Sequence, residues 1–234
     1  MKRQFNPAVP EWMDRPQPVS TELERDLANL RSLNRWFGSY RLVRYFLERW
    51  LRSVESARIL DLATGSGDIP RLIAAWARER HLRVTIDAID QQSSTVEIAR
   101  SLSPSYPEIS FAAANLFEWD PNKKYDLVLF SLALHHFSDE RAVRVLQKCR
   151  QLSRAAVLVA DLRRGRWLSA GIYLLTALIY SEPMTKMDAR LSAARAFSFA
   201  EMRELARRAG WPNFGHAKFP IGRQAIWLDP DENH

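Results

Sequence analysis

Between Ala57 and Leu162 the chain alternates short apolar runs with stretches of helical periodicity. The apolar runs are ARILDLA (57–63), RVTIDAID (83–90), EISFAAAN (108–115), YDLVLFSLAL (125–134) and RAAVLVADL (154–162). Strands that alternate with helices pair in parallel through right-handed crossovers, and the helices cover both faces of the sheet. The sequence therefore predicts an α/β fold with a doubly wound sheet.

Helical segments are expected between and around these runs. They cover residues 20–36, 38–54, 68–81, 93–102, 138–152 and 198–210. Thr21 and Glu24 have the spacing of a capping box. Asp68 is the expected N-cap of its segment, with Pro70 in the first turn, where a missing N–H costs nothing. Ser198 is expected to cap the last segment.

The two ends of the chain differ from its centre. Four prolines in the first 20 residues predict an extended arm, and we expect residues 1–53 to form this arm and cap helices. The sheet domain should then span 54–234, interrupted by a helical lid insertion at about 163–197. Two strands around Pro220–Gly222 should complete the sheet.

Bulk properties are those of an ordinary cytoplasmic protein. The chain has 234 residues, a net charge of +7 and one cysteine, so an internal disulfide is excluded. The longest apolar run, 167–180, is shorter than the roughly 17–25 residues that span a bilayer. We expect no membrane span, with peripheral membrane contact through this run as the alternative.

The stretch ILDLATGSGDIP (59–70) joins the first strand to the next helix. In a doubly wound sheet, ligands bind beyond the carboxyl ends of the strands. Asp61 ends the first strand and Asp90 the second, while Gly65 and Gly67 would let a ligand approach the backbone. We therefore expect the ligand at this edge.

The same stretch restricts the ligand. A dinucleotide site needs a small residue where Pro70 stands, and the charge of Asp68 would repel a pyrophosphate at the helix start. A P-loop is excluded because no Gly-Lys-Ser/Thr follows. A cationic ligand without phosphate, such as S-adenosylmethionine (SAM), suits the acids Asp61, Asp68 and Asp90. A nicotinamide dehydrogenase is the disfavoured alternative.

Four segments together resemble the class I SAM-dependent methyltransferases. They are ILDLATGSGD, VTIDAID, FAAAN and YDLVLFSLALHHF, and the resemblance covers about residues 30–162. Among these enzymes the chain is similar to the ubiquinone/menaquinone-biosynthesis C-methyltransferases and related small-molecule enzymes. The resemblance implies a Rossmann-like seven-stranded sheet, mostly parallel with an antiparallel last strand, and SAM as cofactor.

The resemblance also implies a cofactor site. The residues carried over are Asp61, Ala63, Gly65, Gly67 and Ser131 at the methionine part, Asp90 and Gln91 at the ribose, and Asn115 and Leu116 at the adenine. Asn115 stands where many relatives have Asp, which keeps a hydrogen-bond acceptor and loses a charge.

Candidate catalytic residues follow the fourth and fifth strands. His135, His136 and Asp161 could act on the acceptor, because a weak nucleophile such as a phenol needs a base with a pKa near neutral. The alternative is that one histidine only bonds the neighbouring backbone. The arginines at 163, 164 and 166 could bind a substrate anion or form a solvated loop. We expect no metal site.

The expected reaction is methyl transfer to a lipophilic or aromatic small molecule, such as a quinone precursor or a phenolic polyketide, at oxygen or carbon. A nucleic-acid methyltransferase is an alternative that the positive charge invites, but SLALHHF stands where base-amino methyltransferases carry Asn/Asp-Pro-Pro-aromatic. A non-catalytic SAM-binding regulator is a third alternative. We expect no nucleic-acid partner, and a monomer or homodimer.

Overall fold

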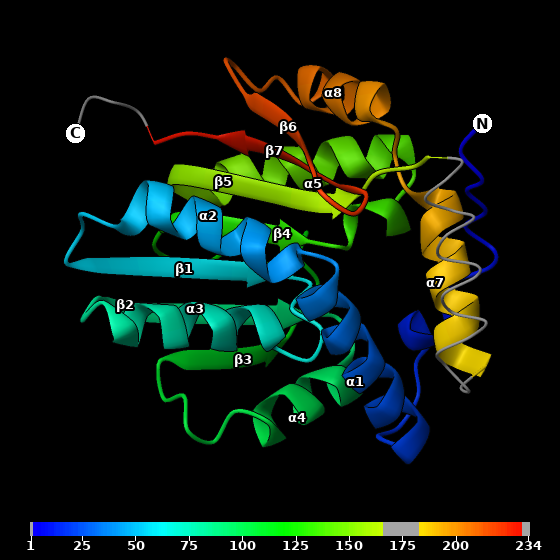
Figure 1. The fold of residues 1–234 in the computed structure, drawn as a ribbon, viewed down its shortest axis with the longest axis horizontal. Helices are drawn as coiled ribbons and strands as arrows, with labels where there is room; N and C mark the ends of the chain where they lie inside the picture. The colour runs from blue at the N-terminus through cyan, green and yellow to red at the C-terminus, as the bar shows by residue number, and fades with distance from the viewer. Residues whose placement is uncertain (1, 166–182, 231–234) are drawn as a thin grey trace.

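The computed structural model describes residues 2–165 and 183–230, and it contains a seven-stranded sheet with helices on both faces (Figure 1). The strand order is β3-β2-β1-β4-β5-β7-β6. The bounds are Ser56–Leu62 (β1), Arg83–Asp90 (β2), Ile109–Ala113 (β3), Tyr125–Ser131 (β4), Ser153–Leu162 (β5), Gly215–Phe219 (β6) and Arg223–Leu228 (β7). β1 to β5 pair in parallel, and β7 runs antiparallel to both β5 and β6. The predicted fold class is confirmed.

Each predicted helical segment has a helix. The bounds are Thr21–Trp36 (α1), Ser39–Leu51 (α2), Asp68–Glu79 (α3), Ser93–Ser101 (α4), Asp139–Leu152 (α5), Pro183–Arg195 (α7) and Phe199–Arg208 (α8), with 3-10 turns at Trp12–Asp14 (η1) and Leu134–His136 (η2). α2 and α3 cover one face of the sheet, and α5 and α8 cover the other (Figure 1).

Alternate residues of the central strands supply the two cores. Ile59 of β1 and Leu127 of β4 pack with α2 and α3, whereas Leu60 and Val128 pack with α5 and α8. This is the period-two geometry of a strand buried on both faces, and it explains why Ile59 and Leu60, and likewise Leu127 and Val128, are consecutive apolar residues.

Two helix starts differ from the prediction. α1 is capped by Ser20, whose side chain accepts from the Leu23 N–H, so the Thr21–Glu24 box does not form. α3 begins one residue earlier than expected, with Gly67 as the N-cap in the left-handed region at φ 73°. Asp68 is then the first helical residue. By contrast, the capping box of Ser198 and Glu201 forms as predicted.

The N-terminal arm lies along α7 (Figure 1). The N–H of Gln4 donates to the Ala194 carbonyl, and Asp188 accepts from the N–H groups of Trp12 and Met13. The arm is extended as predicted except at η1, and these bonds direct its acidic residues toward the carboxyl ends of the strands.

No described helix is long and apolar enough to span a bilayer. The apolar run at 167–180, on which the alternative of membrane docking rests, lies outside the described residues.

Candidate functional site

A cavity of about 420 Å³ opens at the carboxyl ends of β1, β2 and β4. Its volume is in the range of small-molecule sites. The turn after β1 and the ends of β2 and β4 form its floor, while the arm, α1 and α7 form its walls. This is the edge at which the sequence places the ligand.

The turn after β1 forms part of the lining of the cavity. Asp61 is buried and accepts a hydrogen bond from the Thr64 hydroxyl at 2.6 Å. Ala63 and Gly65 have φ of 56° and 55°, and both line the cavity. A Cβ on Gly65 would meet nothing within 4 Å, so the backbone at this position is open to a ligand.

Gly67 has a different role from the one that the resemblance implies. It is absent from the described lining of the cavity, and a Cβ there would lie 2.7 Å from the Phe111 ring. Its φ of 73° starts α3. Gly67 therefore serves the turn and its packing rather than facing the cavity.

Asp90 ends β2 with both carboxylate oxygens engaged. One accepts from the Gly65 N–H at 2.9 Å, and the other from the Gln92 N–H at 3.0 Å. Gln91, also predicted, lines the cavity beside it. Burial raises the pKa of Asp90, and the two N–H donors partly offset that effect.

The cavity floor carries an excess of negative charge. Burial raises the pKa of Asp61 to about 7, and the neighbouring carboxylates of Asp68 and Asp90 contribute in the same direction. Asp68 itself accepts from the side chains of Tyr40 and Asn34. A cationic group in the cavity would stabilise the ionised form of Asp61.

Two of the remaining predicted cofactor residues line the cavity and one does not. Leu116 and Ser131 belong to the lining, and the Ser131 hydroxyl has no hydrogen-bond partner among the described residues. Asn115 is exposed, and its amide bonds Glu118 and the Phe117 N–H within its own turn. The side chain of Asn115 is therefore committed to that turn, because Asn readily closes local loops.

The histidine pair lies on the 3-10 turn η2, after β4. His135 is buried, and its Nδ1 lies 2.7 Å from the Asp161 carboxylate. The backbone N–H of His135 donates to the same carboxylate. The Nδ1 of His136 lies 2.5 Å from the carboxylate of Asp14. Both imidazoles line the cavity, and Asp161 holds one of them from β5.

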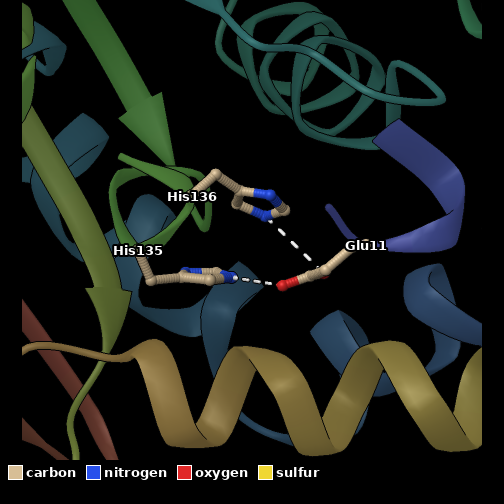
Figure 2. A group of neighbouring side chains, drawn as sticks. All are labelled: Glu11, His135 and His136. Carbon is tan, nitrogen blue, oxygen red and sulfur yellow. Dashed lines mark ion pairs between the residues drawn. The ribbon is translucent and has the colours of Figure 1, made fainter. Parts of the chain in front are cut away.

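Glu11 was not predicted, yet it completes this group. Its carboxylate is 1% exposed and faces the Nε2 atoms of both histidines (Figure 2). The Ser192 hydroxyl of α7 donates to it at 3.0 Å. A glutamate in a proline-rich arm gives no sequence signal for a site more than 120 residues away.

The carboxylates around the histidines affect their ionisation. Burial disfavours the charged form of His136, but Glu11 and Asp14 outweigh it and raise its pKa to about 10. Burial alone would raise the pKa of Asp161, and the contact with His135 lowers it instead. In the absence of bound ligand, His136 is thus an imidazolium rather than a base.

Of the arginines near the end of β5, Arg164 supports the fold, whereas Arg223 of β7 lines the cavity. Arg164 is buried and bonds Glu201 and the Ala196 carbonyl, so it ties α8 to the sheet. Arg166 lies outside the described residues. Arg223 of β7, which was not predicted, is 6% exposed and lines the cavity, with its Nε donating to Ser39.

Comparisons with known proteins agree with this architecture. Residues 59–155 match the model of a methyltransferase domain. A demethylmenaquinone methyltransferase from Thermotoga maritima is 35% identical over 99 residues, which cover 42% of this chain and 40% of that protein.

Solved structures extend the likeness to most of the chain. The plantazolicin methyltransferase BpumL, solved with a substrate analogue and S-adenosylhomocysteine (SAH), has a TM-score of 0.65 at 13% identity and covers 91% of each chain. The methyltransferase domain of the citrinin polyketide synthase has a TM-score of 0.61 at 13% identity, over 80% of this chain and 51% of the other. Residues 59–155 are thus similar to a methyltransferase domain, and the chain shares the fold of these solved methyltransferases.

Proposed function

We propose that the protein transfers a methyl group from SAM to a lipophilic or aromatic small molecule. One observation carries this proposal: a single cavity joins the acidic, glycine-containing turn after β1 to an apolar wall and a polar histidine cluster. Methyl transfer needs donor and acceptor in line and shielded from water, and a shared cavity brings the two together away from bulk solvent.

The floor of the cavity fits the donor. Asp61 is a buried carboxylate that lacks a cationic partner among the described residues, and Gly65 leaves space beside it. We assign Asp61, Ala63 and Gly65 to the methionine part, Asp90 and Gln91 to the ribose, and Leu116 to the adenine. When bound, SAM supplies an electrophilic methyl group on a sulfonium.

The walls of the cavity fit an apolar acceptor. Apolar side chains line it from α1 and from the residues that directly follow α1 and η2, namely Leu27, Leu30, Leu33, Phe37 and Phe137. His135, His136 and Glu11 form its polar end. His135 or Glu11 would accept the proton of an acceptor hydroxyl, and the His136 imidazolium would stabilise the resulting oxyanion. A deprotonated phenol is nucleophilic at oxygen and at ring carbon, so this arrangement serves either kind of methylation.

We also propose that residues 1–53 and α7 are covering elements on a sheet domain of 54–234. Pro10, Met13 and Leu27 come from the first part, and Ala189 and Ser192 from α7, and all five line the cavity. The names of the Thermotoga relative and of the citrinin polyketide synthase domain favour a quinone-related or polyketide acceptor.

Ligand-induced thermal stabilisation tests the donor. SAM and SAH should raise the melting temperature and NADH should not, because a ligand at 100 times its Kd contributes about 2.7 kcal/mol. Stabilisation by NADH alone would contradict the proposed donor.

Transfer of labelled methyl groups tests the acceptor. The chain is incubated with methyl-labelled SAM and either a panel of quinols and phenols or total RNA. Label in the organic extract is expected. Label in RNA would reassign the enzyme to nucleic acid, and SAH binding without transfer to any acceptor would favour a regulator.

A further inference from the structure

We propose that Glu11, His135 and His136 form a binding site for a divalent transition-metal ion at the acceptor end of the cavity. The three side chains come from the arm and from η2 and converge on one point (Figure 2). The inference goes beyond methyl transfer, because metal binding is measurable on the chain without donor or acceptor. It also departs from the expectation of no metal site that the sequence alone supports.

The spacing of the ligand atoms suits an ion between them. The Glu11 carboxylate lies 3.9 Å from Nε2 of His135 and 3.8 Å from Nε2 of His136. These separations exceed hydrogen-bond lengths. Metal bonds of about 2.0–2.2 Å place neighbouring ligand atoms about 3–4 Å apart. All three ligand atoms lie within 4.8 Å of one another, so small side-chain movements complete the site.

The opposite nitrogen of each imidazole is already held by a carboxylate. Nδ1 of His135 contacts Asp161 at 2.7 Å, and Nδ1 of His136 contacts Asp14 at 2.5 Å. A carboxylate behind a ligating histidine fixes the ring orientation and makes Nε2 a stronger donor. A histidine that only fills the core needs one hydrogen-bond partner. Here each of two histidines has a carboxylate at Nδ1, and both direct Nε2 toward the same third carboxylate, Glu11.

The donor set selects the kind of ion. Two imidazole nitrogens and one carboxylate suit zinc or ferrous iron, and they leave coordination positions open for a further ligand. Magnesium prefers an all-oxygen octahedral shell and should bind poorly. Since the three residues line the cavity, an acceptor oxygen could take an open position, where the ion would lower the pKa of a hydroxyl.

Glu11 remains accessible to an ion although guanidiniums lie nearby. Arg195 of α7 forms a buried ion pair with Glu11 at 3.7 Å, longer than a direct hydrogen bond, and its guanidinium bonds the Asn6 and Val9 carbonyls. The guanidiniums of Arg3 and Arg223 interact with Asp161, the carboxylate at Nδ1 of His135. The Nε2 atoms of the two histidines and the Glu11 carboxylate thus keep their ligand atoms directed at one point.

Titration of the untagged 234-residue chain with metal tests the site. After chelator treatment, Zn²⁺ should bind calorimetrically at one equivalent per chain, Co²⁺ should give visible d–d absorption, and Mg²⁺ should do neither. Glu11→Gln and His136→Asn should each weaken Zn²⁺ binding at least about tenfold, and Asp161→Asn by about 10–100-fold. His81→Asn, a surface histidine, is the matched control and should bind as the wild type does.

Circular dichroism and thermal unfolding report whether each variant is folded, independently of metal and of SAH. Absence of stoichiometric Zn²⁺ binding by the wild type overturns the site. So does wild-type affinity in folded Glu11→Gln and His136→Asn chains. If those variants do not fold, a wild-type Co²⁺ spectrum without nitrogen and oxygen ligation overturns the site as well.

Discussion

The backbone N–H of Gly65 donates to the Asp90 carboxylate at 2.9 Å, so the turn after β1 is held by the residue that ends β2. Two strands that are neighbours in the sheet thereby share one binding edge. Some residues of this edge are expected to contact a ligand, and others to stabilise the turn. Substitution of the first group should lower ligand affinity, and substitution of the second group should lower the stability of the fold.

Asp90→Asn should weaken SAH binding by roughly 10–100-fold, because a hydrogen bond to a charged group contributes about 1.5–3 kcal/mol. Calorimetric titration measures the loss. Asp120→Asn, on an exposed loop, is the control and should bind SAH normally. Unchanged affinity in Asp90→Asn would refute the ribose assignment.

The two glycines of the turn should respond differently to alanine. Gly65→Ala should mainly weaken SAH binding, since its Cβ meets no protein atom but occupies cavity space. Gly67→Ala should mainly destabilise the fold, by about 1–3 kcal/mol, because its Cβ meets the Phe111 ring. Both variants carry the strain of a left-handed alanine, and Gly38→Ala measures that strain alone. Denaturant unfolding with SAH titration distinguishes them, and equal effects at 65 and 67 would argue against this division.

The free energy of unfolding should fall as pH rises between about 4 and 7. The pKa of Asp61 is about 7 in the folded chain and near its ordinary value of 3.8 when unfolded, so the folded state binds the extra proton in this window. Asp61→Asn should flatten this part of the profile relative to the wild type, as measured by urea unfolding at several pH values.

Ligand binding should show the opposite trend with pH. If the ammonium group of SAH pairs with ionised Asp61, SAH affinity should decrease below pH 7 and binding there should release a proton. Calorimetry in buffers of different ionisation enthalpy detects that proton. Affinity independent of pH in the wild type would show that no cation meets Asp61.

His135→Asn should reduce turnover by about 10²–10⁴-fold and leave SAH affinity unchanged, because the residue lies at the acceptor end of the cavity. Single-turnover transfer of labelled methyl groups is the measurement. A parallel loss of SAH affinity would place His135 at the donor instead.

Arg164→Met should destabilise the chain by roughly 1.5–3 kcal/mol and leave the KM for acceptor unchanged. The guanidinium bonds Glu201 at 2.7 Å and the Ala196 carbonyl at 2.6 Å, away from the cavity lining. Thermal unfolding measures the loss of stability, and steady-state kinetics measures the KM for acceptor. A raised KM with normal stability would restore Arg164 as a substrate ligand.

The sheet could be predicted because its strands carry their own signal. β1, β4 and β5 are buried on both faces, so each contains consecutive apolar residues, and the helices between them keep a 3.6-residue period. Helix starts carry a weaker signal, because Gly67 caps α3 through backbone conformation and offers no side-chain pattern.

The cavity floor could also be predicted, since Asp61, Gly65 and Asp90 lie at the ends of consecutive strands. Asn115 was predicted at the adenine from the resemblance alone, and its side chain forms hydrogen bonds within its own turn, to Glu118 and the Phe117 N–H. Glu11, Asp14 and Arg223 were missed because only tertiary contacts bring them to the site. Their neighbours in the chain carry no periodic or motif signal.

The long-range contacts of the arm have a consequence for biosynthesis. Asp14 and Arg3 bond residues 122 and 136 positions later, and Gln4 bonds Ala194. At about 5–20 residues per second, the arm leaves the ribosome roughly ten to forty seconds before α7 is made. The arm therefore docks on a helix that is synthesised much later, and this wall of the cavity closes only after α7 is made.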